Sequence, residues 1–192
     1  MRMMKTIALL TGVLLGAVFC GPMACGQDAA APEGAAVKKA TDKKKKKKKE
    51  TKKAEKAPVS VVGKAVKEVK YITSKKADPK ATHYIYLVSA SWCGPCNAEM
   101  PKVVQEYKEM SKCGVELILV SADHDKSQAV GFMNKYGADF PGAMGDTERH
   151  KLPGWKDGSS IPFANIVDAE GNSLASGRAG AIIGNWKQTT GK

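Results

Sequence analysis

The sequence predicts an α/β protein in which helices cover a single central sheet. Two strand-length apolar runs, at residues 83–91 and 115–123, are each followed by a segment with helical spacing of its apolar residues. A hairpin pattern comes later in the chain. Alternating strands and helices that end in a hairpin are typical of one sheet flanked by helices.

The first 25 residues are expected to be a signal peptide. The basic start MRMMK precedes an apolar run of 13 residues, Ile7–Phe19, and small residues follow. That run is shorter than the roughly 20 residues of a membrane-spanning helix, although a short uncleaved anchor is the alternative. Cys25 ends the stretch PMAC, which partly matches a bacterial lipoprotein pattern. We therefore expect export to the periplasm or envelope, with lipidation at Cys25 as a variant of that prediction.

Residues 26–58 are expected to form a disordered, lysine-rich linker. Between Gln27 and Pro58 there are 12 lysines against 5 acidic residues, whereas residues 59–192 carry 17 lysines and arginines against 14 acidic residues. The net charge of +12 is therefore concentrated before the folded part, and it does not indicate a nucleic-acid-binding surface. A solvated spacer is the favoured interpretation. The alternative is that Lys43–Lys49 contacts an anionic membrane surface.

Residues 59–192 are expected to form the folded domain. Val59–Thr73 is rich in β-branched residues and predicts a short strand or hairpin. His83–Ser91 predicts a buried parallel strand because it is a nearly continuous apolar run. A helix is predicted to follow from about Pro95 and to end before Gly114. Four apolar residues fall on one face of it: Met100, Val103, Val104 and Tyr107.

The second half of the domain repeats this alternation. Val115–Asp123 predicts a second buried strand, and Lys126–Gly137 predicts a second helix that ends at a glycine. Pro162–Gly180 predicts a hairpin that turns at Glu170–Asn172. A helix over 182–190 is expected to close the chain.

The stretch SASWCGPC contains the pair Cys93 and Cys96. A structural zinc site needs four ligands, and the histidines and the remaining cysteine after the leader do not supply them at paired spacing. A purely structural disulfide across so short a loop would remove little chain entropy. Redox exchange remains, with Cys93 as the attacking thiolate at an exposed helix start and Cys96 as the resolving thiol. Trp92 either caps this site or is a core aromatic.

Further residues around WCGPC resemble the thioredoxin-like proteins. Pro101 stands where thioredoxins kink this helix, and Ile161-Pro162 matches the Ile and cis-proline that face the cysteines in that fold. The resemblance covers Tyr84 to Gly180 and implies a thioredoxin-like fold with a mixed sheet. It also implies that Trp92, Ile161 and Pro162 bind substrate, with the Ile161 backbone pairing with the bound peptide.

The stretches CNAEMP and VDAEGN are most similar to exported TlpA/ResA-type thiol–disulfide oxidoreductases, and SASWCGPC is also similar to the tryparedoxin/nucleoredoxin branch. Cytosolic thioredoxins have a buried Asp where this chain has Leu87, whereas ResA-type proteins carry a Glu three residues after the second cysteine, as Glu99 is here. Glu99 is therefore predicted to exchange a proton with Cys96; the alternative is that it complements the helix dipole. The loop 149–162, which contains Trp155, and Phe163 depart from the ResA pattern.

The resemblance implies a reductase of disulfides in envelope proteins, recharged by a membrane electron donor and needing no metal or other cofactor. A disulfide oxidase or isomerase is one alternative, and a redox-inert binding module on a polybasic arm is another. Ala90 disfavours a peroxidase, which would need a hydroxyl residue there. Cys113 is expected to be an inert buried thiol rather than a third redox partner, and the DHD stretch at 123–125 a solvated turn rather than a cation site.

Overall fold

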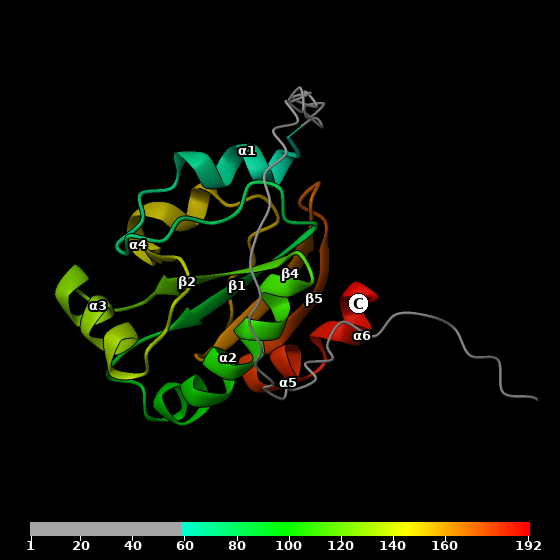
Figure 1. Ribbon diagram of the computed structural model, residues 1–192. Coiled ribbons are helices and arrows are strands. Elements are labelled where there is room, and N and C mark those ends of the chain that lie inside the picture. Colours follow the sequence, from blue (N-terminus) through cyan, green and yellow to red (C-terminus); the bar gives the residue numbers. More distant parts are fainter. Residues whose placement is uncertain (1–58) are drawn as a thin grey trace, which may run out of the picture.

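The computed structural model describes residues 59–192, so the predictions for the signal peptide, Cys25 and Lys43–Lys49 lie outside the described residues. The described chain forms a five-stranded sheet in the order β3-β2-β1-β4-β5 (Figure 1). Its strands are β1 (His83–Ser89), β2 (Val115–Ser121), β3 (Gly142–Met144), β4 (Phe163–Asp168) and β5 (Ser173–Arg178). Since β1 to β3 are parallel and β4 is antiparallel to both β1 and β5, the predicted mixed sheet is confirmed.

Helices cover both faces of the sheet (Figure 1). One face packs against α2 (Gly94–Lys112), α3 (Lys126–Lys135), α5 (Ala179–Gly184) and α6 (Trp186–Thr190). The other face packs against α1 (Val61–Glu68) and the loop around Leu152, and the short helices α4 (Gly145–Glu148) and η1 (Arg149–Lys151) lie on this side. The sheet therefore separates two apolar cores.

The predicted strands and helices of the central region are confirmed. Alternate residues of β1 point into the two cores, with Ile85 and Leu87 on the α2 side and Tyr84 and Tyr86 on the α1 side. Burial on both faces explains the continuous apolar run that predicted this strand. Gly114 follows α2 with φ of 71°, as a glycine stop requires.

The prediction of a strand or hairpin over Val59–Thr73 is wrong, because most of this segment is helix α1. The Ser60 hydroxyl caps the helix by accepting a hydrogen bond of 3.0 Å from the Gly63 amide. Val62 and Val66, four residues apart, are both fully buried on one side of the helix. Tertiary burial at helical spacing thus outweighs the β propensity of the valines.

Three further features differ from the prediction. The short strand β3 and the helix α4 that follows it were not predicted, since three and four residues carry too little periodicity. The single helix expected over 182–190 is two helices, α5 and α6, which meet at Asn185.

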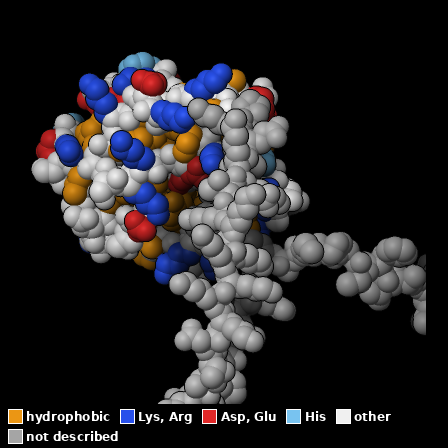
Figure 2. Space-filling model, turned by 45° about the horizontal axis from the view of Figure 1, so that its top comes forward, with side chains coloured by type: hydrophobic (Ala, Val, Ile, Leu, Met, Phe, Trp, Pro, Cys, Tyr) orange, Lys and Arg blue, Asp and Glu red, His pale blue; other side chains and the backbone are white. Residues whose placement is uncertain are grey.

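Charged side chains of both signs are interspersed over the folded part of the chain. On the face drawn in Figure 2, lysine and arginine side chains are scattered, with acidic and hydrophobic side chains between them. Among the helices of residues 59–192, none is long and apolar enough to cross a bilayer.

Glu148 is a buried carboxylate that links the end of α4 to the segment after α1. It accepts hydrogen bonds of 2.8 Å from the Lys70 amide and from Lys151 Nζ. Burial alone would raise the pKa of Glu148, but these hydrogen bonds outweigh it and hold the pKa below its ordinary value. A carboxyl group whose pKa is lower in the folded than in the unfolded state stabilises the fold at pH values above its unfolded-state pKa of 4.5. This stabilisation is lost as the pH falls through the folded-state pKa.

We therefore expect Glu148→Gln to lower the free energy of unfolding at pH 7 by about 1–3 kcal/mol, with a smaller difference below about pH 4. Urea unfolding at several pH values measures this. Asp146→Asn in the same helix is the control, because Asp146 is exposed. A Glu148→Gln deficit that is the same at pH 3 and pH 7 would contradict the assignment.

Candidate active site

The predicted cysteine pair lies at the start of α2, the helix that follows β1. Cys93 is the N-cap of α2 and forms a disulfide with Cys96, with the two Cα atoms 5.2 Å apart. The Cys96 amide donates a hydrogen bond of 3.2 Å to Cys93 Sγ. Pro95 fits in this first turn because its missing N–H would have no partner in the helix. The local sequence therefore places Sγ of Cys93 directly at the helix start.

The helix start favours a thiolate at Cys93 in the reduced protein. The α2 helix is 19 residues long, and its dipole places positive potential at the N-terminus. This potential stabilises a negatively charged sulfur there. The expectation that Cys93 is exposed is wrong, since its residue is only 6% exposed, but Cys96 is still more deeply covered at 1%. Of the two cysteines, Cys93 is therefore the more exposed residue.

A groove of about 340 Å³ runs beside the disulfide. Its walls come from the start of α2, the loop before β4 and the end of β5, and they comprise Pro95, Ser159, Ser160, Ile161, Pro162, Phe163, Gly177 and Arg178. Cys93 Sγ lies 3.8 Å from the Ile161 carbonyl oxygen, and the Ile161-Pro162 peptide bond is cis as expected. The structure thus brings the predicted substrate-binding residues Ile161 and Pro162 to the cysteines.

The aromatic residues near the site have separate positions. Trp92 is 61% exposed, which rules out the core alternative and leaves its ring available beside the cysteines. Trp155 packs on Tyr86 with ring centroids 6.0 Å apart, on the α1 side of the sheet. Within the loop 149–162, only the final residues line the groove, whereas Trp155 lines a separate pocket.

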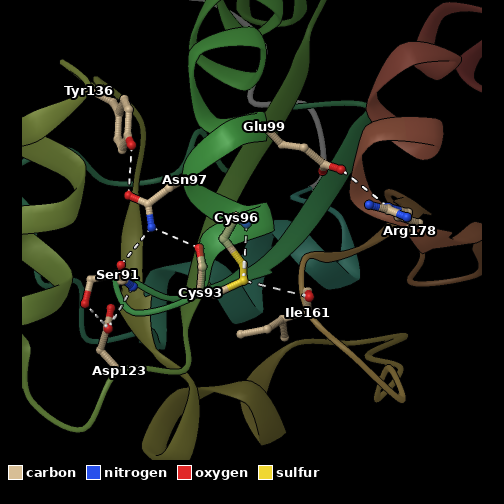
Figure 3. The surroundings of a disulfide bond; sticks show 9 residues. All are labelled: Ser91, Cys93, Cys96, Asn97, Glu99, Asp123, Tyr136, Ile161 and Arg178. Atoms are coloured by element: carbon tan, nitrogen blue, oxygen red, sulfur yellow. Dashed lines mark hydrogen bonds and ion pairs between the residues drawn. A yellow bond between two sulfur atoms is a disulfide. The ribbon is translucent and has the colours of Figure 1, made fainter.

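Asn97 fixes the cysteine loop to α3, which the sequence did not predict. Its side-chain amide donates hydrogen bonds to the carbonyl oxygens of Ser91, at 2.8 Å, and Cys93, at 2.9 Å. Its side-chain oxygen accepts a hydrogen bond of 2.8 Å from Tyr136 Oη (Figure 3). The same oxygen accepts a hydrogen bond of 3.0 Å from Lys135 Nζ. One side chain thereby links the residues before and after Trp92 to the end of α3.

Asp123 holds the same loop from the end of β2. Its carboxylate accepts hydrogen bonds from the Ser91 amide, at 2.9 Å, the Ser91 hydroxyl, at 2.7 Å, and the Ser121 hydroxyl, at 2.8 Å. The prediction of a solvated turn is wrong for Asp123, which is 6% exposed. It is correct for His124 and Asp125, which are exposed. Hydrogen bonds from Ser127 and the Gln128 amide lower the pKa of Asp125, which caps α3.

We expect Asn97→Ala to lower the free energy of unfolding by about 1–3 kcal/mol and to change the reduction potential of the cysteine pair. The substitution removes the groups that fix the Cys93 carbonyl without changing the net charge. Urea unfolding and redox titration measure the two effects. Asn134→Ala on α3 is the control, since Asn134 is exposed. An unchanged potential would show that Asn97 acts on stability alone.

Glu99 lies one helical turn after Cys96, at the spacing that puts two side chains on one helix face. Its Oε1 is 3.6 Å from Arg178 Nε, and its Oε2 is buried without a hydrogen-bond partner among the described residues (Figure 3). Leu87 is fully buried in the core, so the position of the thioredoxin aspartate is apolar here. Glu99 is thus a carboxylate one helical turn from Cys96.

The other candidates lie apart from this site. Cys113 caps the far end of α2 and packs, half-buried, against the first core. Within residues 59–192, no three His, Cys, Asp or Glu side chains lie together in a way that could hold a metal ion.

A disulfide at the start of the helix that follows the central strand of a mixed sheet, beside a cis-proline loop, is the arrangement of thioredoxin-like proteins of the thiol–disulfide oxidoreductase class. We assign the protein to that class. Residues 53–173 match the family described as the AhpC/TSA family, and the chain belongs to this family.

Curated relatives agree with the expected resemblance. Thiol-disulfide oxidoreductase ResA of Bacillus subtilis is 35% identical over 81 residues, which are 42% of this chain and 44% of that protein. Probable nucleoredoxin 1 of Arabidopsis thaliana is 42% identical over 48 residues, which are 24% of this chain and 8% of that protein. The chain thus spans less than half the length of these relatives.

Solved structures show the same fold. Tryparedoxin II from C. fasciculata superposes with a TM-score of 0.52 at 21% identity, covering 66% of this chain and 91% of that one. At this identity the likeness establishes the fold alone. The predicted thioredoxin-like fold and the similarity to the ResA and tryparedoxin/nucleoredoxin groups are therefore confirmed.

Proposed function

We propose that the protein is an exported thiol–disulfide oxidoreductase that reduces disulfides of envelope proteins through Cys93 and Cys96. The observation that carries this proposal is the position of Cys93 Sγ, which lies at a helix start and 3.8 Å from the Ile161 carbonyl oxygen in the groove. The helix dipole favours the thiolate there, and the groove gives a client peptide a place beside it.

The reaction uses the two cysteines in turn. The Cys93 thiolate attacks one sulfur of the client disulfide, which breaks, and the other client sulfur leaves as a thiolate and takes up a proton. The Cys96 thiol loses its proton to Glu99, and the resulting thiolate attacks Cys93. The bond from Cys93 to the client breaks, which releases the second client thiol and leaves the Cys93–Cys96 disulfide.

The dipeptide Gly94-Pro95 supports the proposed direction, because it is the one in thioredoxin, a reductant with a potential near −270 mV. An exported reductant must be recharged, so a membrane electron donor is part of the proposal, with oxidised cysteines of envelope proteins such as apocytochromes as clients. Residues 1–25 would direct export. Lys43–Lys49 would hold the protein near an anionic membrane surface.

Insulin reduction in dithiothreitol tests the activity. We expect the protein to accelerate precipitation of the insulin B chain, and the double variant Cys93→Ser, Cys96→Ser to be inactive. If the double variant is as active as the unchanged protein, the proposal fails. A redox-inert binding module would instead show no activity in either form. Deleting residues 38–56 should weaken vesicle association at low salt if the lysine run binds the membrane.

A further inference from the structure

Arg178 connects the client groove with the proton acceptor of the proposed reaction. It ends β5, lines the groove, and its side chain is 74% exposed. Its Nε atom is 3.6 Å from Glu99 Oε1. The same guanidinium is therefore accessible to a bound client and paired with Glu99.

The groove offers a client one charged partner. Besides Arg178, its lining consists of proline, serine, isoleucine, phenylalanine and glycine residues, all of them uncharged. A guanidinium presents several donors in a plane and binds carboxylates in two-point geometry. The charge of this groove is therefore complementary to an acidic side chain on the client.

Glu99 depends on this pairing, because its environment provides little else for its charge. Its side chain is 22% exposed, and its Oε2 has no hydrogen-bond partner among residues 59–192. Gly180 is packed against the carboxylate, since a Cβ atom there would lie 2.9 Å from Oε1. Among residues 59–192, Arg178 is therefore the cation that pairs with this carboxylate.

We propose that Arg178 recognises a carboxylate next to the reacting cysteine of the client and that this contact releases Glu99 to accept the proton of Cys96. This inference rests on the proposed reductase activity. The acidic client would bind Arg178 while Cys93 attacks the client disulfide. Glu99, without its cation, would then accept the Cys96 proton, and the Cys96 thiolate would displace the client from Cys93. Acidic clients would thus gain in both binding and turnover.

Three peptides with an intramolecular disulfide test this, each identical except for Glu, Gln or Lys beside one cysteine. Reduction is followed with the full chain and dithiothreitol. We expect kcat/KM to be about tenfold higher for the Glu peptide than for the Lys peptide, as for a charge-assisted contact at a groove rim. Arg178→Glu should reverse this order, and Arg178→Gln should remove it.

Lys108→Glu is the matched control, because Lys108 is exposed on α2 outside the groove and the charge change is the same. It should leave the order of the peptides unchanged. In the Glu99→Gln variant, the Glu peptide should still have a lower KM than the Lys peptide but should no longer have a higher kcat. A purely structural role of Arg178 would not separate KM from kcat in this way.

Two outcomes would separate the proposals. If the unchanged protein reduces all three peptides at equal rates, the role of Arg178 is refuted and the reductase function stands. If it reduces none of them, the reductase function itself fails. If Lys108→Glu reverses the order of the three peptides as strongly as Arg178→Glu does, the preference comes from the overall charge of the protein. That result would also refute the specific role of Arg178.

Discussion

Replacing Cys96 by serine is expected to trap a covalent complex between Cys93 and a client, whereas replacing Cys93 is expected to reduce disulfide exchange to the uncatalysed rate. Cys93 Sγ faces the Ile161 carbonyl oxygen in the groove, whereas Cys96 is only 1% exposed. We therefore expect Cys93 to make the first attack. Without Cys96, no internal thiol can resolve the mixed disulfide.

Non-reducing electrophoresis and mass spectrometry with insulin measure this trapping. The background carries Cys20→Ser, Cys25→Ser and Cys113→Ala, so that no other thiol takes part. The background protein alone must retain exchange activity. A trapped complex with Cys93→Ser and none with Cys96→Ser would contradict the assigned roles.

Glu99→Gln is expected to slow resolution of the mixed disulfide by about 10²- to 10⁴-fold, the usual contribution of a positioned general base. The first attack by Cys93 should be almost unchanged, because that sulfur is activated by the helix start rather than by Glu99. Rapid-mixing kinetics on a preformed mixed disulfide separate the two steps.

Glu109→Gln is the control for this prediction. Glu109 lies on the same helix and pairs with Lys112 at 3.4 Å, so its replacement makes the same charge change far from the cysteines. If both variants resolve the mixed disulfide at the same rate, Glu99 is not the proton acceptor. The alternative interpretation from the sequence, that Glu99 only complements the helix dipole, would then hold.

Much of the fold could be predicted because the strands that carry the site are buried on both faces. β1 and β2 read as continuous apolar runs, and the Cys-x-x-Cys pair begins the helix between them. α1 was missed since its valines suggest a strand, although Ser60 and the spacing of Val62 and Val66 were available as signals for a helix.

The supporting contacts of the site could not be read from the sequence. Arg178 and Glu99 are 79 residues apart, and Tyr136 and Asn97 are 39 apart, so only the folded topology brings each pair together. Asp123 follows a predicted strand, yet nothing in its neighbours shows that two serines would hold it below the surface. The cysteines were evident because their chemistry is local, whereas the groups that position them are distant along the chain.

The reduction potential of the Cys93–Cys96 couple tests the central claim most directly. Equilibration of the protein with glutathione or dithiothreitol buffers, followed by thiol trapping, gives this value. The proposed reductase requires a potential near or below about −250 mV. A potential between about −120 and −180 mV would contradict it and would identify a protein that forms or rearranges disulfides instead.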